Sequence, residues 1–185
     1  MKKILKYFLI MLVLLSNVSA ENVSDIQHLR NEFNIAITNK ENANKLYFQL
    51  SALKPAKNTL QYAYLGATEA LLAKHAINPF SKLSYVNSAM RKLNMAVELN
   101  KNDIEIRYMR FSVESNMPAY LGYNEHIEVD KNILIKGLSN VSIDKFNCKM
   151  YQVFATGLLN SDYCNLHEKS LLSVIISRCQ KAQLN

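Results

Sequence analysis

The sequence predicts an all-α fold of about eight helices arranged as antiparallel hairpins, on the strength of three observations. The 185 residues include only four glycines and three prolines, so few positions interrupt regular structure. Apolar residues recur at intervals of three and four along most of the chain, which is the spacing of one helix face. Residues that commonly cap helix N-termini precede most of these apolar series. We therefore expect long helices joined by short loops rather than many short strands.

The first 20 residues have the pattern of a secretory signal peptide. Three lysines precede an unbroken apolar run, Leu9–Leu15. Val18 and Ala20 then stand at positions −3 and −1 of a cleavage site, so we expect cleavage between Ala20 and Glu21. The alternative is an uncleaved membrane anchor, but the apolar run is shorter than the roughly 20 residues that a spanning helix needs.

Removal of residues 1–20 leaves residues 21–185 as a single domain, because no linker or low-complexity segment divides them. We expect this domain to lie in the periplasm or outside the cell. The leader carries three lysines and no acid, so the formal net charge falls from +7 for the whole chain to +4 for the mature domain. No block of basic residues predicts a nucleic-acid partner, and no second apolar segment predicts a membrane span in the mature protein.

The first three expected helices follow one another closely. Ser24 and Gln27 form a capping box before the first, and Asn39 can cap the second. Pro55 separates the second helix from the third. The third helix carries a stripe of small residues that would let a neighbouring helix approach closely: Ala63, Gly66, Ala67 and Ala70.

The next two helices have clear starts. Asn78 and Pro79 form a pair of N-cap and first helical residue. The helix that they start is expected to reach about Leu99 through Leu83, Val86, Met90, Leu93 and Val97. Asn102 and Glu105 form a box-like start for the fifth helix. It should end near Asn116, because Pro118 disfavours helical geometry in the preceding residue.

Three further helices are expected after a short turn over residues 118–122. The sixth should run from about Asn124 to Lys136. Ser142 caps the seventh, which is expected to place Phe146, Met150 and Val153 on one face before Asn160 and Ser161 end it. The eighth carries Leu166, Leu171, Leu172, Ile175, Ile176 and Cys179.

The stretch SAMRKLNMAVELNKND, residues 88–103, resembles the second helix of a tetratricopeptide repeat. Ala89, Leu93 and Ala96 hold the small, large and small positions of that helix, and Lys101 stands where the family has proline. In the preceding helix, the aromatic, leucine and glycine positions correspond to Tyr62, Leu65 and Gly66. The segment between the two helices is too long for a 34-residue repeat, so the match covers about one repeat.

A second resemblance covers most of the mature chain. The stretches YLGATEALLAKHAINPFSKL and EIRYMRFSVESNMPAYLGYNEHIEVDK resemble a family of small exported bacterial proteins with no assigned activity, whose members are similar to tetratricopeptide proteins. This resemblance implies stacked helix pairs and export. It transfers no catalytic residue to this chain.

Catalytic and metal-binding motifs do not stand out. The four glycines are too dispersed for a phosphate-binding loop, and the chain has neither a G-x-S-x-G nor an H-E-x-x-H motif. The histidines and cysteines match no zinc spacing. Cys164 and His167 lie three residues apart, which is a common coincidence on one helix. We expect no enzymatic activity, no cofactor and no metal site.

The three cysteines allow one disulfide in an oxidising compartment, although all three could be small buried apolar residues. We expect no obligatory disulfide. If one forms, Cys148–Cys179 is favoured over Cys164–Cys179, because the latter two lie 15 residues apart on one expected helix. The helical rise then separates them by about 22 Å.

The expected fifth helix contains Arg107 and Arg110 within an apolar pattern, and Glu114 lies on the same stripe. Glu114 can pair with Arg110, whereas Arg107 has no acid three or four residues away. Glu128, with Glu125 and Asp130, offers carboxylates beyond the turn. Two interpretations remain open for Arg107, Arg110, Glu114 and Glu128: an ion-pair cluster that holds the helices together, or a site for a ligand carboxylate or phosphate.

Two functions follow from these features. The leading hypothesis is a non-catalytic interaction or scaffold module that binds an unidentified protein or peptide, since stacked helix pairs form a concave surface. The alternative is a binder of a small acidic ligand that uses Arg107 and Arg110 in a helical groove.

Overall fold

The computed structural model describes residues 26–54, 57–140 and 148–184. Within these ranges the chain forms eight α-helices and a short 3-10 helix, and no strand, which confirms the all-α prediction. The elements are a helix over residues 26–36, α2 (Lys40–Leu50), α3 (Thr59–His75), α4 (Pro79–Leu99), α5 (Ile104–Ser115), η1 (Ala119–Leu121), α6 (Ile127–Asn140), α7 (Cys148–Leu159) and α8 (Leu166–Leu184).

Two of the predicted helix starts are confirmed by their hydrogen bonds. The Asn39 side chain accepts from the backbone N–H of Asn42 at the start of α2. The Asn78 side chain accepts from two backbone N–H groups in the first turn of α4, and Pro79 is the first helical residue. These caps satisfy N–H groups that have no acceptor within the helix.

Two other predicted boundaries are wrong. The side chain that caps α5 is Asp103, not Asn102, and it accepts from the backbone N–H groups of Glu105 and Ile106. α6 begins at Ile127 and ends at Asn140, rather than running from Asn124 to Lys136. The Glu114 carboxylate accepts from the backbone N–H of His126, 3.0 Å away, just before the first residue of α6.

Several residues named from the sequence lie outside the described ranges. They are the run Leu9–Leu15, Val18, Ala20, Glu21, Ser24, Pro55, Ser142 and Phe146.

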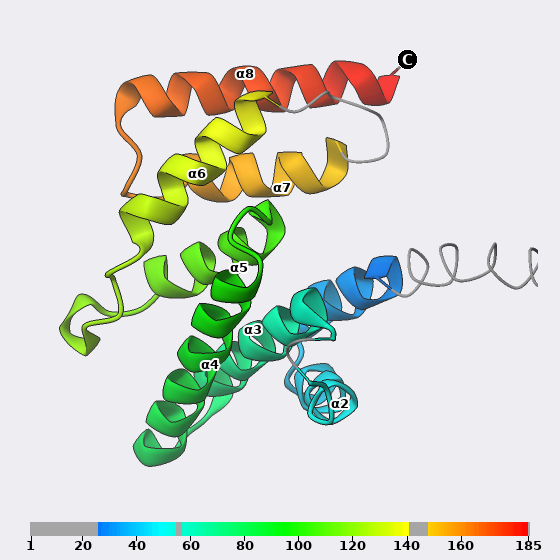
Figure 1. Cartoon of the computed structure of the whole chain (residues 1–185), viewed down its shortest axis with the longest axis vertical. Coiled ribbons are helices and arrows are strands. Elements are labelled where there is room, and N and C mark those ends of the chain that lie inside the picture. The colour runs from blue at the N-terminus through cyan, green and yellow to red at the C-terminus, as the bar shows by residue number, and fades with distance from the viewer. Residues whose placement is uncertain (1–25, 55–56, 141–147, 185) are drawn as a thin grey trace, which may run out of the picture.

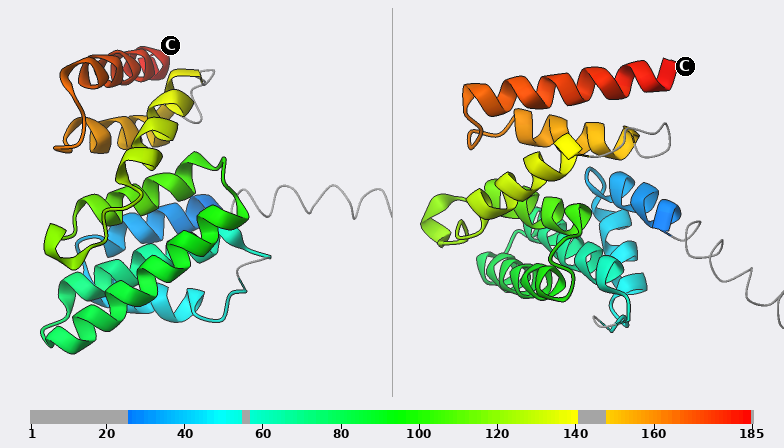
Figure 2. Two further views of the ribbon diagram at one scale, coloured as in Figure 1. Left: turned by 60° about the vertical axis from the view of Figure 1, so that its left-hand side comes forward. Right: turned by 45° about the horizontal axis from the view of Figure 1, so that its top comes forward.

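The helices enclose two hydrophobic cores that share α5. The first core lies among residues 26–36, α2, α3, α4 and one side of α5, where it includes Leu46, Leu93 and Ile106. The second core lies between the other side of α5 and α6, α7 and α8, where it includes Phe111 and Leu172. Figures 1 and 2 show α5 in the middle, with α3 and α4 toward one end of the molecule and α7 and α8 at the other.

The close packing of α3 on α4 depends on the small-residue stripe of α3. A Cβ atom at Gly66 would lie 3.1 Å from the backbone oxygen of Ala89 and from Cγ of Leu93 on α4. Ala63 and Ala67 are also buried. The stripe therefore allows the close approach that its composition predicts.

The predicted apolar face of α7 is wrong at Val153, whereas Met150 packs against the second core as predicted and Phe146 lies outside the described residues. Val153 is 52% exposed, whereas the buried residues are Cys148, Tyr151, Phe154, Ala155 and Leu158. The ring of Phe154 stacks on Tyr108 of α5, with ring centroids 4.3 Å apart, so this residue rather than Val153 faces the second core. On α8 the second core takes Leu172, Ile175 and Cys179, while Leu166 is 88% exposed. None of the described helices has both the length and the apolar character needed to cross a membrane.

Candidate binding cleft and the buried arginine cluster

Arg107 and Arg110 of α5 both bind the carboxylate of Asp130, in the first turn of α6. The Nη1 atom of Arg107 lies 2.6 Å from Asp130 Oδ1. Arg110 makes a two-point contact, from Nε to Oδ2 at 2.7 Å and from Nη2 to Oδ1 at 2.9 Å. Spacing of three residues on α5 places both guanidinium groups on one side of the helix, where a single acid can meet them.

The remaining contacts of the two arginines extend this cluster to α4. Arg107 Nε donates to the backbone oxygen of Lys101 at 2.6 Å, in the loop before α5. Arg110 Nη1 donates to the side-chain oxygen of Asn94 on α4 at 3.1 Å. Asp130 is fully buried and both arginines are less than a tenth exposed. The cluster therefore joins α4, α5 and α6 by charged groups that are removed from water.

Glu114 binds His126 rather than Arg110. The carboxylate is 1% exposed, and its Oε1 atom lies 2.7 Å from Nδ1 of His126. Its Oε2 atom accepts from the backbone N–H of the same residue. The turn through Pro118 and Gly122 brings these two residues together, and Gly122 adopts the positive φ of 73° that this turn requires.

Glu128 lies apart from the arginines. Its side chain is 66% exposed and pairs with Lys131, 2.9 Å away on the same helix. Lys131 also contacts Glu168 of α8 at 3.3 Å. Although burial lowers the pKa of Lys131, its hydrogen bonds to Glu128 and Glu168 raise that pKa above the ordinary value. The four residues grouped from the sequence thus belong to three separate ion-pair sites.

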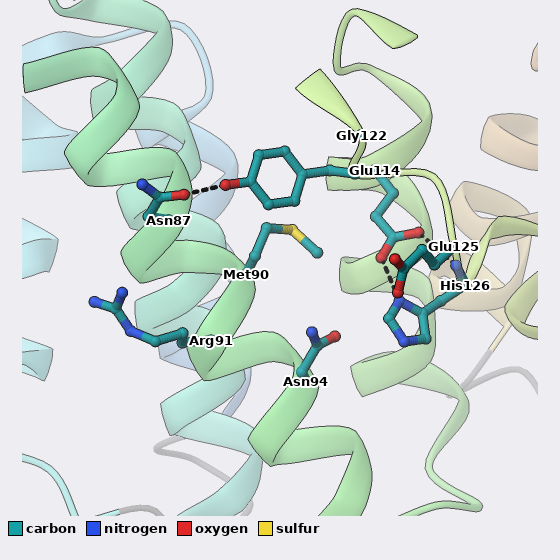
Figure 3. A pocket seen from close by; sticks show the side chains of 9 residues that line it. Asn87, Met90, Arg91, Asn94, Glu114, Gly122, Glu125 and His126 are labelled. Carbon is teal, nitrogen blue, oxygen red and sulfur yellow. Dashed lines mark hydrogen bonds and ion pairs between the residues drawn. The ribbon is translucent and has the colours of Figure 1, made fainter. Parts of the chain in front are cut away.

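A half-open cleft of about 280 Å³ lies beside the arginine cluster (Figure 3). α4 forms one wall, and the end of α5 with the segment before α6 forms the other. The residues that line it are Asn87, Met90, Arg91, Asn94, Glu114, Gly122, Tyr123, Glu125 and His126.

The two asparagines of the cleft use their side-chain oxygens within the protein. The Tyr123 hydroxyl donates to Oδ1 of Asn87, and Arg110 donates to Oδ1 of Asn94. Each amide therefore retains its NH₂ group as a donor. The positions of Asn87 and Asn94 on α4 differ by seven residues, which is about 10 Å along a helix axis.

Sequence reasoning did not identify Asn87, Asn94 or His126 as parts of a site. Two asparagines on a helix carry no recognisable motif, and His126 is separated from its partner by 12 residues and a turn. Only the proline and glycine between Glu114 and His126 indicated that the chain reverses there.

A second buried ionic cluster ties the N-terminal helix to α5. Arg30 binds both carboxylate oxygens of Glu105, at 2.8 and 2.6 Å, and the Tyr64 hydroxyl donates to the same carboxylate at 2.6 Å. The hydrogen bond to Glu105 raises the pKa of Arg30. Burial, reinforced by the negative charge of Glu105, strongly raises the pKa of Tyr64. Arg30 and Tyr64 both bind the buried Glu105 carboxylate, so the cluster ties the first helix and α3 to α5.

The cysteines are all buried and free. Cys179 of α8 and Cys148 of α7 are both buried in the second core. Burial, together with the neighbouring Cys148 thiol, raises the pKa of Cys179 to about 12. Cys164 lies instead at the loop before α8, where its sulfur is 3.9 Å from the Ser161 hydroxyl. In the described part of the chain, no three His, Cys, Asp or Glu side chains are grouped to hold a metal ion.

Comparisons with protein families, curated proteins and solved structures give no match for this chain. The resemblance to tetratricopeptide proteins therefore stays a prediction from the sequence.

Proposed function

We propose that the protein is an exported, non-catalytic interaction module with tetratricopeptide-like stacking of its helix pairs. Its partner is a protein or peptide segment that binds in the cleft between α4 and the segment before α6. The proposal combines the leader pattern of the sequence with the geometry of this cleft.

One observation carries the binding role: Asn87 and Asn94 line a half-open cleft from positions two turns apart on one helix, and their side-chain oxygens are already used within the protein. Asn87 and Asn94 have their oxygens fixed by Tyr123 and Arg110, so their donors are held in place before a partner arrives. Backbone carbonyl groups of an extended segment are matching acceptors. Donors that are already fixed lose little conformational entropy on binding.

The charges of the cleft favour a polar peptide over a small acidic ligand. The lining includes Arg91 and Glu125 as exposed charges of opposite sign, and the Glu114 carboxylate is already in contact with the side chain and backbone N–H of His126. Asp130 occupies Arg107 and Arg110, which an acidic ligand would need.

The test is site-specific cross-linking followed by a binding measurement. A photo-cross-linking amino acid is placed at position 91, on the wall of the cleft, in the cell that produces the protein. The captured segment is then synthesised, and its affinity is measured for the wild-type protein and for Asn87→Leu. We expect the variant to bind roughly tenfold more weakly, because it loses one donor and the placement of Tyr123.

The matched control places the same cross-linker at Lys181, an exposed position on α8 at the other end of the molecule. Capture of the same species from both positions would contradict the proposal. Unchanged affinity in Asn87→Leu would contradict it equally, provided that the melting temperature shows the variant to be folded.

A further inference from the structure

The loop between α3 and α4 exposes large apolar side chains that the first core does not use. Ile77 is 95% exposed and Phe80 is 85% exposed. Leu83, which continues the apolar series of α4 in the sequence, is 46% exposed, so the buried face of that helix begins only at Val86. Every residue from 77 to 84 is exposed. This stretch, hereafter the α3–α4 tip, therefore forms a projection rather than a groove.

The surroundings of the α3–α4 tip carry positive charge and no exposed acid in the sequence on either side. No aspartate or glutamate occurs between Glu69 and Glu98. Glu69 is itself buried and binds the ammonium group of Lys92 at 2.9 Å. Lys74 and Lys82 flank the apolar side chains, and both are exposed. The helix dipole adds partial positive charge at the start of α4.

The position of the α3–α4 tip leaves it free to approach a flat surface. Figure 1 shows the start of α4 at the lower end of the molecule, remote from α7 and α8. A projection of aliphatic and aromatic side chains flanked by two lysines can enter the headgroup layer of a bilayer, which is fluid and needs no matching shape. A protein partner would instead need a complementary surface of roughly 800 Å².

We propose that the α3–α4 tip is a contact site for an anionic lipid surface. Ile77, Phe80 and Leu83 enter the boundary between headgroups and acyl chains, and Lys74 and Lys82 bind lipid phosphates. The contact is peripheral and reversible, since three side chains bury little area. It goes beyond the proposed function, because it involves neither the cleft nor a protein partner.

The test is sedimentation of the purified protein with vesicles. One set contains equal parts phosphatidylglycerol and phosphatidylcholine, and the other contains phosphatidylcholine alone. We expect binding to the anionic vesicles to fall about tenfold or more when Ile77→Ser and Phe80→Ser are combined. Lys74→Gln and Lys82→Gln should each weaken it roughly fivefold, and added salt should weaken it further.

Leu166→Ser is the matched control, since Leu166 is 88% exposed at the start of another helix. It should bind anionic vesicles as the wild type does. If residues 1–20 remained attached, they would raise the affinity of every variant for vesicles by the same factor. The ratio of each variant's affinity to that of the wild type would therefore still test the proposal. Far-ultraviolet circular dichroism checks that each variant keeps the helical content of the wild type.

Three results would overturn the proposal. The first is a wild-type protein that does not sediment with anionic vesicles. The second is the failure of either contrast. The wild type would then bind both vesicle types equally, or Leu166→Ser would lose as much binding as the serine double variant. The third is self-association of the protein that disappears in the serine double variant while vesicle binding does not change, which would assign the tip to a second copy of the chain.

Discussion

Asp130 of α6 is the central acid of the buried cluster that connects α4, α5 and α6. A fully buried carboxylate is costly unless its charge is compensated, and here two guanidinium groups from α5 compensate it. The pairing leaves the cluster with one positive charge in excess. The carbonyl oxygen of Lys101 and the amide oxygen of Asn94 accept the donors that remain after Asp130 is satisfied.

Replacement of Asp130 should therefore destabilise the fold more than replacement of either arginine. Asp130→Asn leaves two buried cations without an acid and should cost about 3–5 kcal/mol. For a domain of this size, that loss should lower the melting temperature by roughly 10 °C. Arg107→Ala should cost less, because Asp130 keeps its two-point contact with Arg110. Thermal unfolding of the three proteins measures the order.

Glu128→Gln is the control for this series, because its side chain is 66% exposed and its ion pair is worth little. Its melting temperature should match the wild type within about 1 °C. A melting curve of Asp130→Asn that coincides with the wild type would contradict the structural role of the cluster.

The sequence predicted part of this cluster. The two arginines stood out because charged residues interrupted an apolar pattern, and Asp130 was one of three acids offered beyond the turn. The choice among those acids depends on where α6 begins, since a helix that starts at Ile127 turns Asp130 inward and Glu128 outward. The contact between Glu114 and His126 just before that start is also indicated by no local pattern.

At the scale of elements, the capping residues of α2 and α4 were predicted correctly, whereas the capping residue of α5 and the place of Val153 on α7 were not. Asn39 and Asn78 act through backbone groups two or three residues away, so their roles can be read from the local sequence. The buried face of α7 depends on the stacking of Phe154 against Tyr108, 46 residues earlier in the chain. The apolar spacing of α7 allows more than one face, and only its neighbours decide between them.

The hairpin of α7 and α8 makes a clear prediction for the cysteines. In the folded protein, mild oxidation should join Cys148 to Cys179 and leave Cys164 reduced. The oxidant is a small disulfide, which accepts two electrons as the two thiols lose their protons. Because burial and the neighbouring thiol hold Cys179 protonated at neutral pH, the reaction should be at least tenfold slower than in denaturant. Peptide mapping without reduction identifies the pair.

Cys164→Ala should retain the linked peptides, and Cys148→Ala should abolish them. A peptide that joins Cys164 to Cys179 would show that the hairpin is arranged differently.

The raised pKa of Cys179 also determines how the stability of the fold changes with pH. The contribution of the neutral Cys179 thiol is complete below pH 9.0 and is lost as the pH rises toward about 12, because the unfolded thiol ionises first.

For the whole molecule, the leader pattern predicts a shorter mature protein. We expect N-terminal sequencing of the protein recovered from expressing cells to begin at Glu21, because Val18 and Ala20 fit the small-residue requirement of signal cleavage. Ala20→Phe should block this processing and leave a protein about 20 residues longer. A wild-type protein that begins at Met1 and sediments with membranes would contradict the prediction.

α5 contributes buried side chains to both cores, so neither core is fully covered without it. Ile106 and Met109 face the first core, while Phe111 faces the second. If one half melted alone, it would leave an apolar side of α5 in water together with the buried charges around Asp130. Heat should therefore melt both halves in one cooperative transition, and the calorimetric enthalpy should equal the van't Hoff enthalpy. In native hydrogen exchange, the amides of α5 would open only with the entire chain.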